Sequence, residues 1–377
     1  MFILTVISTF LGMHLFAWVR LHRQIKFSKK IFCSGLLLCI LLTCSIIIVR
    51  LFPDNWPEWV IKSAWHLSFF WVGFLFYAFV LQLGFLILEF GALTVLPKHY
   101  YRQLKYGLGI LAVPAALLIL CFGYYTAAGP PTITEYFIHT DKTDTPLKVA
   151  LVADNHLGIQ SPPAETKRLV HALEKESPDL CLFAGDIFND HPGLLDAHIN
   201  LLAQFNPPGK KFAVLGNHEI YFGEKEAVEL MERSKIHLLR NNVYAIPETN
   251  IQLAGIDDPA RKPDRDRVFN NAQKSVLKQL DADKFTILIT HRPKGLNNSA
   301  KSGVDLQLSG HTHNGQIFPF KFLVALAYPY TYGEYRKDNT RLIVTRGFGT
   351  WGPSARVLSP PEIVILHILP QDQENNK

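Results

Sequence analysis

Apolar residues dominate the first third of the chain, where they form four long runs with few charged residues. The runs cover residues 2–19, 31–49, 64–88 and 106–126. Each run is close to the ~20 residues that an α-helix needs to cross the hydrocarbon layer of a bilayer. Helices of soluble proteins rarely stay apolar on every face over such a length. The pattern therefore predicts a transmembrane region with four helices over residues 1–128.

The charges in the short loops between the runs predict an orientation. Basic residues stay on the cytoplasmic side of a membrane, and they gather in the loops after the first and the third run. The loop after the second run is balanced, with Asp54 and Glu58 against Arg50 and Lys62. We therefore expect a multi-pass protein of the cell membrane whose downstream domain lies on the extracytoplasmic side. Glu89, near the end of the third helix, is expected at the membrane interface.

The hydrophobic pattern changes after residue 128. An alternating stretch at residues 132–140 predicts an edge strand within a connecting segment, residues 129–147. From residue 148 to 369, short runs of β-forming residues end in Gly, Asp or Asn and alternate with helical segments or loops, as is typical of buried strands. This alternation predicts a domain of helices packed on sheet, followed by a tail at residues 370–377.

Polar side chains directly follow five of the predicted strands, at their carboxyl ends. In open layered sheets this edge is where ligands bind, so residues distant in sequence are expected to converge there. Aspartate, histidine and asparagine are all metal ligands. The residues are Asp154, His156, Asp186, Asn217, His218, His291, His311 and His313.

The motifs that contain these residues resemble those of the calcineurin-like metallophosphoesterases. They are DNH at 154–156, GD at 185–186, GNHE at 216–219, THR at 290–292 and GHTH at 310–313. The segments LITHRP, LSGHTHNGQIFP and RGFGTWGPSARVLSPPEI are similar to a narrower branch, the membrane-associated bacterial phosphoesterases. The resemblance covers residues 148–369 and implies an αββα sandwich that holds two divalent metal ions.

The resemblance also implies the ligands of each ion, with Asp186 bridging the two. They are, for one ion, Asp154, His156 and His313, and for the other, Asn217, His291 and His311. Such mixed oxygen and nitrogen ligands suit Mn, Fe or Zn. Two ions joined by a carboxylate lower the pKa of a shared water, which supplies hydroxide to attack phosphorus.

Other residues of these motifs are expected to contact the substrate or to position a residue that does. His218 is similar to the family's catalytic histidine, which protonates the leaving oxygen. Glu219 either orients the imidazole of His218 or simply faces solvent. Arg292, next to His291, either contacts a substrate phosphate, as Asn217 is also expected to do, or forms a surface ion pair. Arg346 and Arg356 in the closing motif are similar candidates.

The charge distribution excludes a nucleic-acid partner. The net charge is +6, but residues 1–130 hold ten Lys and Arg against three acidic residues, and the remainder holds 28 against 29. The basic excess therefore belongs to the membrane region, and the downstream domain lacks the basic stripe that a phosphate backbone requires. The expected partners are a lipid bilayer and a phosphorylated small-molecule or lipid substrate.

Two classes of function fit this organisation. The first is a metal-dependent phosphoric ester hydrolase: a membrane-anchored monoesterase, phosphodiesterase or pyrophosphatase. The second is a membrane sensor or transporter-associated protein whose outer domain binds metal without catalysis. The complete ligand set favours the enzyme, and so does the expectation that the four helices lack clustered charges. Because the domain is tethered close to the bilayer, lipid-linked phosphates are the preferred substrates.

Overall fold

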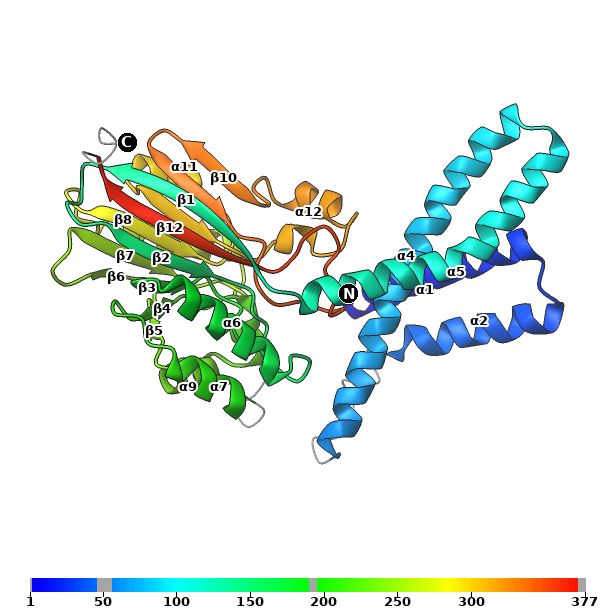
Figure 1. Ribbon diagram of the computed structural model, residues 1–377, viewed down its shortest axis with the longest axis horizontal. Helices are drawn as coiled ribbons and strands as arrows, with labels where there is room; N and C mark the ends of the chain where they lie inside the picture. The colour runs from blue at the N-terminus through cyan, green and yellow to red at the C-terminus, as the bar shows by residue number, and fades with distance from the viewer. Residues whose placement is uncertain (1, 46–55, 190–194, 372–377) are drawn as a thin grey trace. The chain divides into compact units, whose positions relative to one another are not determined.

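The computed structural model describes residues 2–45, 56–189 and 195–371. The chain divides into two compact units (Figure 1). One consists of Met1–Tyr125 with the short loop Gly352–Ala355, and the other of Thr126–Trp351 with Arg356–Lys377.

The first unit is helical. Its described helices are α1 (Phe2–Ile25), α2 (Lys29–Thr43), α4 (Glu58–Val95) and α5 (Lys98–Ala128). The helix α4 ends just before Leu96, which is extended because Pro97 follows it. Among the described helices, three are long and apolar enough to cross a membrane: α1 from Leu4, α4 and α5.

The prediction of four membrane helices is not confirmed. The second predicted run, residues 31–49, corresponds to α2, which has 15 residues. This is shorter than the ~20 residues that a membrane span needs. The last four residues of the run lie outside the described residues.

A buried polar cluster joins α1 to α4, and its two charged residues lie just beyond the ends of the first and third apolar runs. Arg20 donates to Glu89 at 2.7 Å, and Gln24 donates to the same carboxylate oxygen at 2.8 Å. Gln82 then donates to Gln24 at 2.9 Å. Glu89, which we expected at the membrane interface, is 3% exposed because these side chains enclose it.

The described residues of the second unit form two six-stranded sheets (Figure 1). The first has the order β1 (Thr132–Thr140), β12 (Glu362–Pro370), β2 (Leu147–Val152), β3 (Leu180–Phe183), β4 (Lys211–Ala213) and β5 (His237–Leu238). The second has the order β10 (Gly333–Lys337), β11 (Thr340–Val344), β9 (Leu306–Ser309), β8 (Phe285–Thr290), β7 (Ile251–Ile256) and β6 (Asn242–Ala245).

Helices cover the outer face of each sheet, so the αββα sandwich is present. One buried cluster lies between the sheets and contains side chains of both, such as Leu151 and Ile287. A second joins the first sheet to α6 (Pro163–Glu176), α7 (Asp196–Gln204) and α9 (Glu224–Arg233). A third joins the second sheet to α10 (Arg265–Leu277). Short helices follow other strands: α8 (Asn217–Phe222), α11 (Leu296–Lys301), η2 (His313–Gly315) and α12 (Lys321–Ala327).

The strand directions place the loops that follow β2, β3 and β4 at one edge of the first sheet, because these strands are parallel. The strand β12 runs antiparallel to β2, so its first residue, Glu362, lies beside the end of β2. Thr132, the first residue of β1, pairs with Glu362. The chain therefore enters the second unit at the edge where these polar loops lie.

Candidate metal centre

Five of the predicted ligands lie in segments that directly follow strands. Asp154 and His156 follow β2, and Asp186 follows β3. His311 and His313 follow β9. All five have positive φ, between 48° and 72°. This left-handed backbone costs a non-glycine residue about 1–3 kcal/mol, and it persists where the surrounding structure and a function require it. The strain here lies in the turns that aim the ligands inward.

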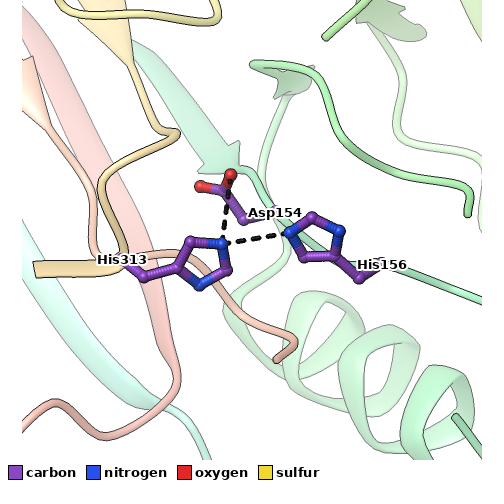
Figure 2. A group of neighbouring side chains, drawn as sticks. All are labelled: Asp154, His156 and His313. Carbon is purple, nitrogen blue, oxygen red and sulfur yellow. Dashed lines mark hydrogen bonds and ion pairs between the residues drawn. The ribbon is translucent and has the colours of Figure 1, made fainter. Parts of the chain in front are cut away.

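The structure brings Asp154, His156 and His313 together, as the motif matching implies (Figure 2). The two imidazole Nε2 atoms are 3.0 Å apart, and Nε2 of His313 is 3.6 Å from Oδ1 of Asp154. The Nδ1 atom of His156 donates to Oδ1 of Asn189 at 2.9 Å, because an amide oxygen can only accept. This bond leaves the lone pair of His156 Nε2 facing the cluster. Sequence reasoning missed Asn189, which no motif marks.

A second cluster forms around His291. Its Nδ1 atom donates to the carbonyl oxygen of Ala184 at 2.8 Å, so its Nε2 atom points into the site. That Nε2 atom lies 3.1 Å from Oδ2 of Asp186, 3.0 Å from Nδ1 of His311 and 3.2 Å from Oδ1 of Asn217. Nitrogen and oxygen atoms of these types, gathered from four residues, can bind one cation together. The residues therefore fit a bound cation.

Asp186 lies between the two clusters. Its Oδ2 atom is 3.1 Å from His291 Nε2 and 4.0 Å from the Nε2 atoms of both His156 and His218. Its Oδ1 atom accepts the backbone N–H of His218 at 2.8 Å. The described residues contain three overlapping groups of His and Asp whose ligand atoms lie within 4.8 Å of one another, which suggests a dimetal site.

The electrostatics of the site favour the binding of a cation. Burial lowers the pKa of His291, but the Asp186 carboxylate and other acidic groups outweigh it and raise that pKa to about 10. Burial also lowers the pKa of His156, to about 3, and raises the pKa of Asp154, to about 7. Most of the imidazoles are therefore neutral and offer lone pairs, while the buried carboxylates lack a full counter-charge.

The structure corrects one of the two expectations for Glu219, that it faces solvent. The side chain is 0% exposed, so it does not face solvent. Its Oε1 atom accepts the backbone N–H groups of Ile187 and Phe188, and its Oε2 atom accepts those of Asp186 and Gly216. Four backbone N–H groups donate to the carboxylate, so Glu219 holds the turn that carries Asp186.

Arg292 forms an ion pair, but it does so inside the site. Its Nε atom is 2.5 Å from Oδ2 of Asp258, and its Nη1 atom donates to the hydroxyl of Tyr328 at 3.0 Å. Its Nη2 atom lies 3.4 Å from Oδ1 of Asn217. The Tyr328 hydroxyl is also 2.7 Å from Nε2 of His311. Neither Asp258 nor Tyr328 belongs to the five motifs.

Arg356 is not available to a substrate. The side chain is 0% exposed, and it donates to the backbone carbonyls of Arg346, Gly347, Gly349 and Ser359. Its role is to hold the closing motif against the core, which corrects its inclusion among the substrate-binding candidates.

Comparison with known proteins agrees with this geometry. The family model for the calcineurin-like phosphoesterases matches residues 147–315. An uncharacterized metallophosphoesterase of Campylobacter jejuni is 32% identical over 277 residues, which cover 72% of each chain. A transmembrane protein with a metallophosphoesterase domain from Danio rerio is 29% identical over 327 residues, 82% of this chain and 74% of the relative. Together with the apolar helices, the latter match suggests membrane association. The chain belongs to the calcineurin-like metallophosphoesterase family.

Proposed function

We propose that this protein is a membrane-anchored phosphoesterase with two metal ions that hydrolyses phosphoester or pyrophosphate bonds. The observation that carries the proposal is the position of Asp186, whose Oδ2 atom lies within 4.0 Å of imidazole nitrogens from both clusters. Asp186 would hold both ions. The remaining ligands would be Asp154, His156 and His313 for one ion, and Asn217, His291 and His311 for the other.

The bound ions would supply a water of lowered pKa and would neutralise charge on the phosphoryl group. His218 is placed to transfer the proton. Its side chain is 20% exposed, which leaves it accessible to a substrate, and its backbone N–H is fixed by the Asp186 carboxylate. It would donate a proton to the leaving oxygen. Arg292, held by Asp258 and Tyr328, would bind a phosphoryl oxygen beside Asn217.

The proposed substrates are phosphates and diphosphates linked to lipids, on the extracytoplasmic side of the membrane. The helix α5 ends at Ala128 and β1 begins at Thr132, so the catalytic domain follows a candidate membrane span after three residues. Such a short tether raises the effective concentration of the domain at the lipid surface. A reporter enzyme fused after Lys377 tests on which side of the membrane the catalytic domain lies. Activity of that reporter in the cytoplasm alone would contradict the extracytoplasmic location.

Activity of the full chain tests the catalytic proposal. The protein, purified in detergent, is assayed with Mn, Fe or Zn on bis-p-nitrophenyl phosphate and p-nitrophenyl phosphate. We expect Asp186→Ala to lower the rate by about a thousandfold, because the bridging carboxylate is lost. Asp196→Ala is the control, since Asp196 forms an exposed ion pair with Arg233.

Two results would contradict the proposal: a wild type that is inactive with every metal, or an Asp186→Ala variant with the full rate. Metal binding without hydrolysis would then favour the sensor alternative.

A further inference from the structure

The helix α12 presents apolar side chains to the surface of the second unit. All seven of its residues are described, and none is buried. Phe322 is 59% exposed, Leu323 57% and Leu326 86%. A helix that only packs on its own domain buries its apolar face, and a contiguous exposed apolar surface marks an interaction site. We name the side chains of Phe320, Phe322, Leu323 and Leu326 the α12 surface.

The composition around the α12 surface indicates lipid as the occupant. Residues 314–332 contain no Asp or Glu and a single basic residue, Lys321. The Lys321 Nζ atom lies 5.7 Å and 5.4 Å from the ring centroids of Phe318 and Phe322. Three tyrosines follow the helix, at positions 328, 330 and 332. Apolar residues bordered by tyrosine and lysine are typical of segments at the bilayer interface, where anionic head groups attract the cation.

Both ends of α12 lie next to segments that contact or carry candidate metal ligands. At its start, a Cβ atom on Gly315 would collide with the backbone of Lys321, so the helix packs against η2, which begins with His313. At its end, the backbone N–H of Tyr328 bonds to Val324, and the Tyr328 hydroxyl reaches His311. A surface that contacts α12 is therefore close to the candidate ligands.

The chain enters the second unit at the edge of the first sheet that carries the site, three residues after a candidate membrane span. The three residues between α5 and β1 span at most about 14 Å. The strand β1 begins at the same edge of the sheet at which β2, the strand that Asp154 follows, ends, with β12 between them. The chain therefore passes from α5, a candidate membrane span, into the domain at the edge that carries the site.

We propose that the α12 surface inserts into the bilayer interface and holds the metal centre at the level of the lipid head groups. The occupant of this surface is lipid, and the site receives phosphates carried by membrane-resident molecules. The choice of substrate rests on the proposed function. The contact with lipid does not, so the two are tested separately.

The first experiment measures depth in the membrane. The five cysteines are free and are replaced in the full chain, and a nitroxide is attached at Leu326→Cys. The protein is reconstituted in vesicles of phosphatidylethanolamine and phosphatidylglycerol. We expect oxygen to relax this label more strongly than a water-soluble nickel chelate does. Val268→Cys on α10, where Val268 is 36% exposed, is the control and should show the reverse.

Two outcomes of this experiment would overturn the proposal. A Leu326 label that behaves like the Val268 control lies in water. A label shielded from both reagents is covered by protein and not by lipid. Neither result depends on whether the protein hydrolyses anything.

The second experiment compares two substrates in the same vesicles. One is p-nitrophenyl hexadecyl phosphate embedded in the bilayer, and the other is soluble bis-p-nitrophenyl phosphate. For the double variant Leu323→Glu/Leu326→Glu we expect about a tenfold loss on the embedded ester alone. Val268→Glu should change neither rate.

The pattern of losses separates the two proposals. Equal rates of wild type and double variant on the embedded ester would overturn the role of the α12 surface. If the double variant loses both rates, its fold is disturbed, and the label at Leu326 decides. A wild type that hydrolyses neither ester contradicts the proposed function, whereas the depth measurement still tests the contact with lipid.

Discussion

At the scale of single residues, the candidate ligands position one another through the backbone. The N–H of His311 donates to both oxygens of Asp154, at 3.0 Å and 2.9 Å. The N–H of His218 donates to Asp186. Each carboxylate is thus oriented by the turn that carries another motif, and charge-assisted bonds of this kind are about twice as strong as neutral ones. The two halves of the site are interdependent for this reason.

Glu219→Gln tests the bonds that hold the Asp186 turn. The amide nitrogen of glutamine would face backbone N–H donors, so at least one buried donor would lose its acceptor. We expect a loss of about 2–3 kcal/mol in stability and a lower rate of hydrolysis. Thermal unfolding and the p-nitrophenyl assay measure the two effects.

The control for this variant is Glu224→Gln. Glu224 pairs with Arg240 at the surface, where an ion pair contributes ~1 kcal/mol or less. If Glu219→Gln matched the wild type in both assays, the four backbone bonds would have no structural importance.

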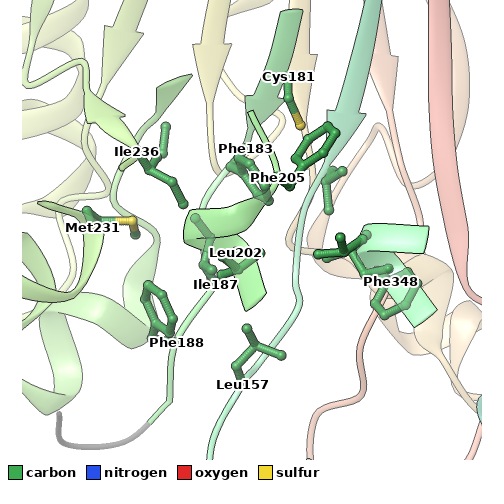
Figure 3. Close-up of a cluster of buried hydrophobic side chains, with 14 of the residues drawn as sticks. Leu157, Cys181, Phe183, Ile187, Phe188, Leu202, Phe205, Met231, Ile236 and Phe348 are labelled. Carbon is green, nitrogen blue, oxygen red and sulfur yellow. The ribbon is translucent and has the colours of Figure 1, made fainter. Parts of the chain in front are cut away.

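At the scale of elements, the central strands of the first sheet, such as β3, are apolar on both faces because each face has its own core. In β3, Cys181 and Phe183 pack against the helices, as Figure 3 shows, and Leu180 and Leu182 pack between the sheets. A strand of this kind is a continuous apolar run in the sequence. The strand β3 ends at Phe183, and the turn that carries Asp186 begins there.

The buried ion pair between Arg20 and Glu89 joins α1 to α4, and Glu89→Ala tests its contribution to stability. The substitution leaves Arg20 buried without its carboxylate, and we expect a loss of about 3–5 kcal/mol. The double variant Arg20→Met/Glu89→Met removes both charges, so it should recover most of the stability. Thermal unfolding in detergent measures both variants. A double variant no more stable than the single one would show that the charge of Arg20 is not the cause.

At the scale of the whole molecule, the second unit contains buried carboxylates that need cations. Asp154 and Asp186 are 0% and 2% exposed. Ions that bind the folded state alone stabilise it by about 2.7 kcal/mol at a concentration a hundred times the dissociation constant. We therefore expect a chelator to lower the unfolding temperature of the full chain, and added Mn to restore it.

The double variant Asp154→Ala/His313→Ala is the matched control for chelation, because it lacks two ligands of one proposed ion. Its unfolding temperature should respond less to the chelator than that of the wild type. An equal response in both proteins would place the stabilising ions elsewhere.

The sequence by itself determined the order of the elements and the position of the site. Periodicity is a local property, so apolar runs mark strands wherever a sheet has two buried faces. Polar residues at the ends of parallel strands meet at one edge, whatever the details of packing. The resemblance of the motifs implied that His156 and His313, 157 residues apart, bind the same ion, and the structure brings the two side chains together. The separate ligand roles stay predictions that the assays above test.

The tertiary structure alone decided which polar groups meet across the fold. The bonds of Glu219 to the Asp186 turn, of Arg292 to Asp258 and of Tyr328 to His311 join segments on different strands. The same holds for the tie between Arg20 and Glu89, which are 69 residues apart. No local pattern encodes such pairs. Each depends on where two backbones come to lie, and that is set by the packing of the sheets and helices between them.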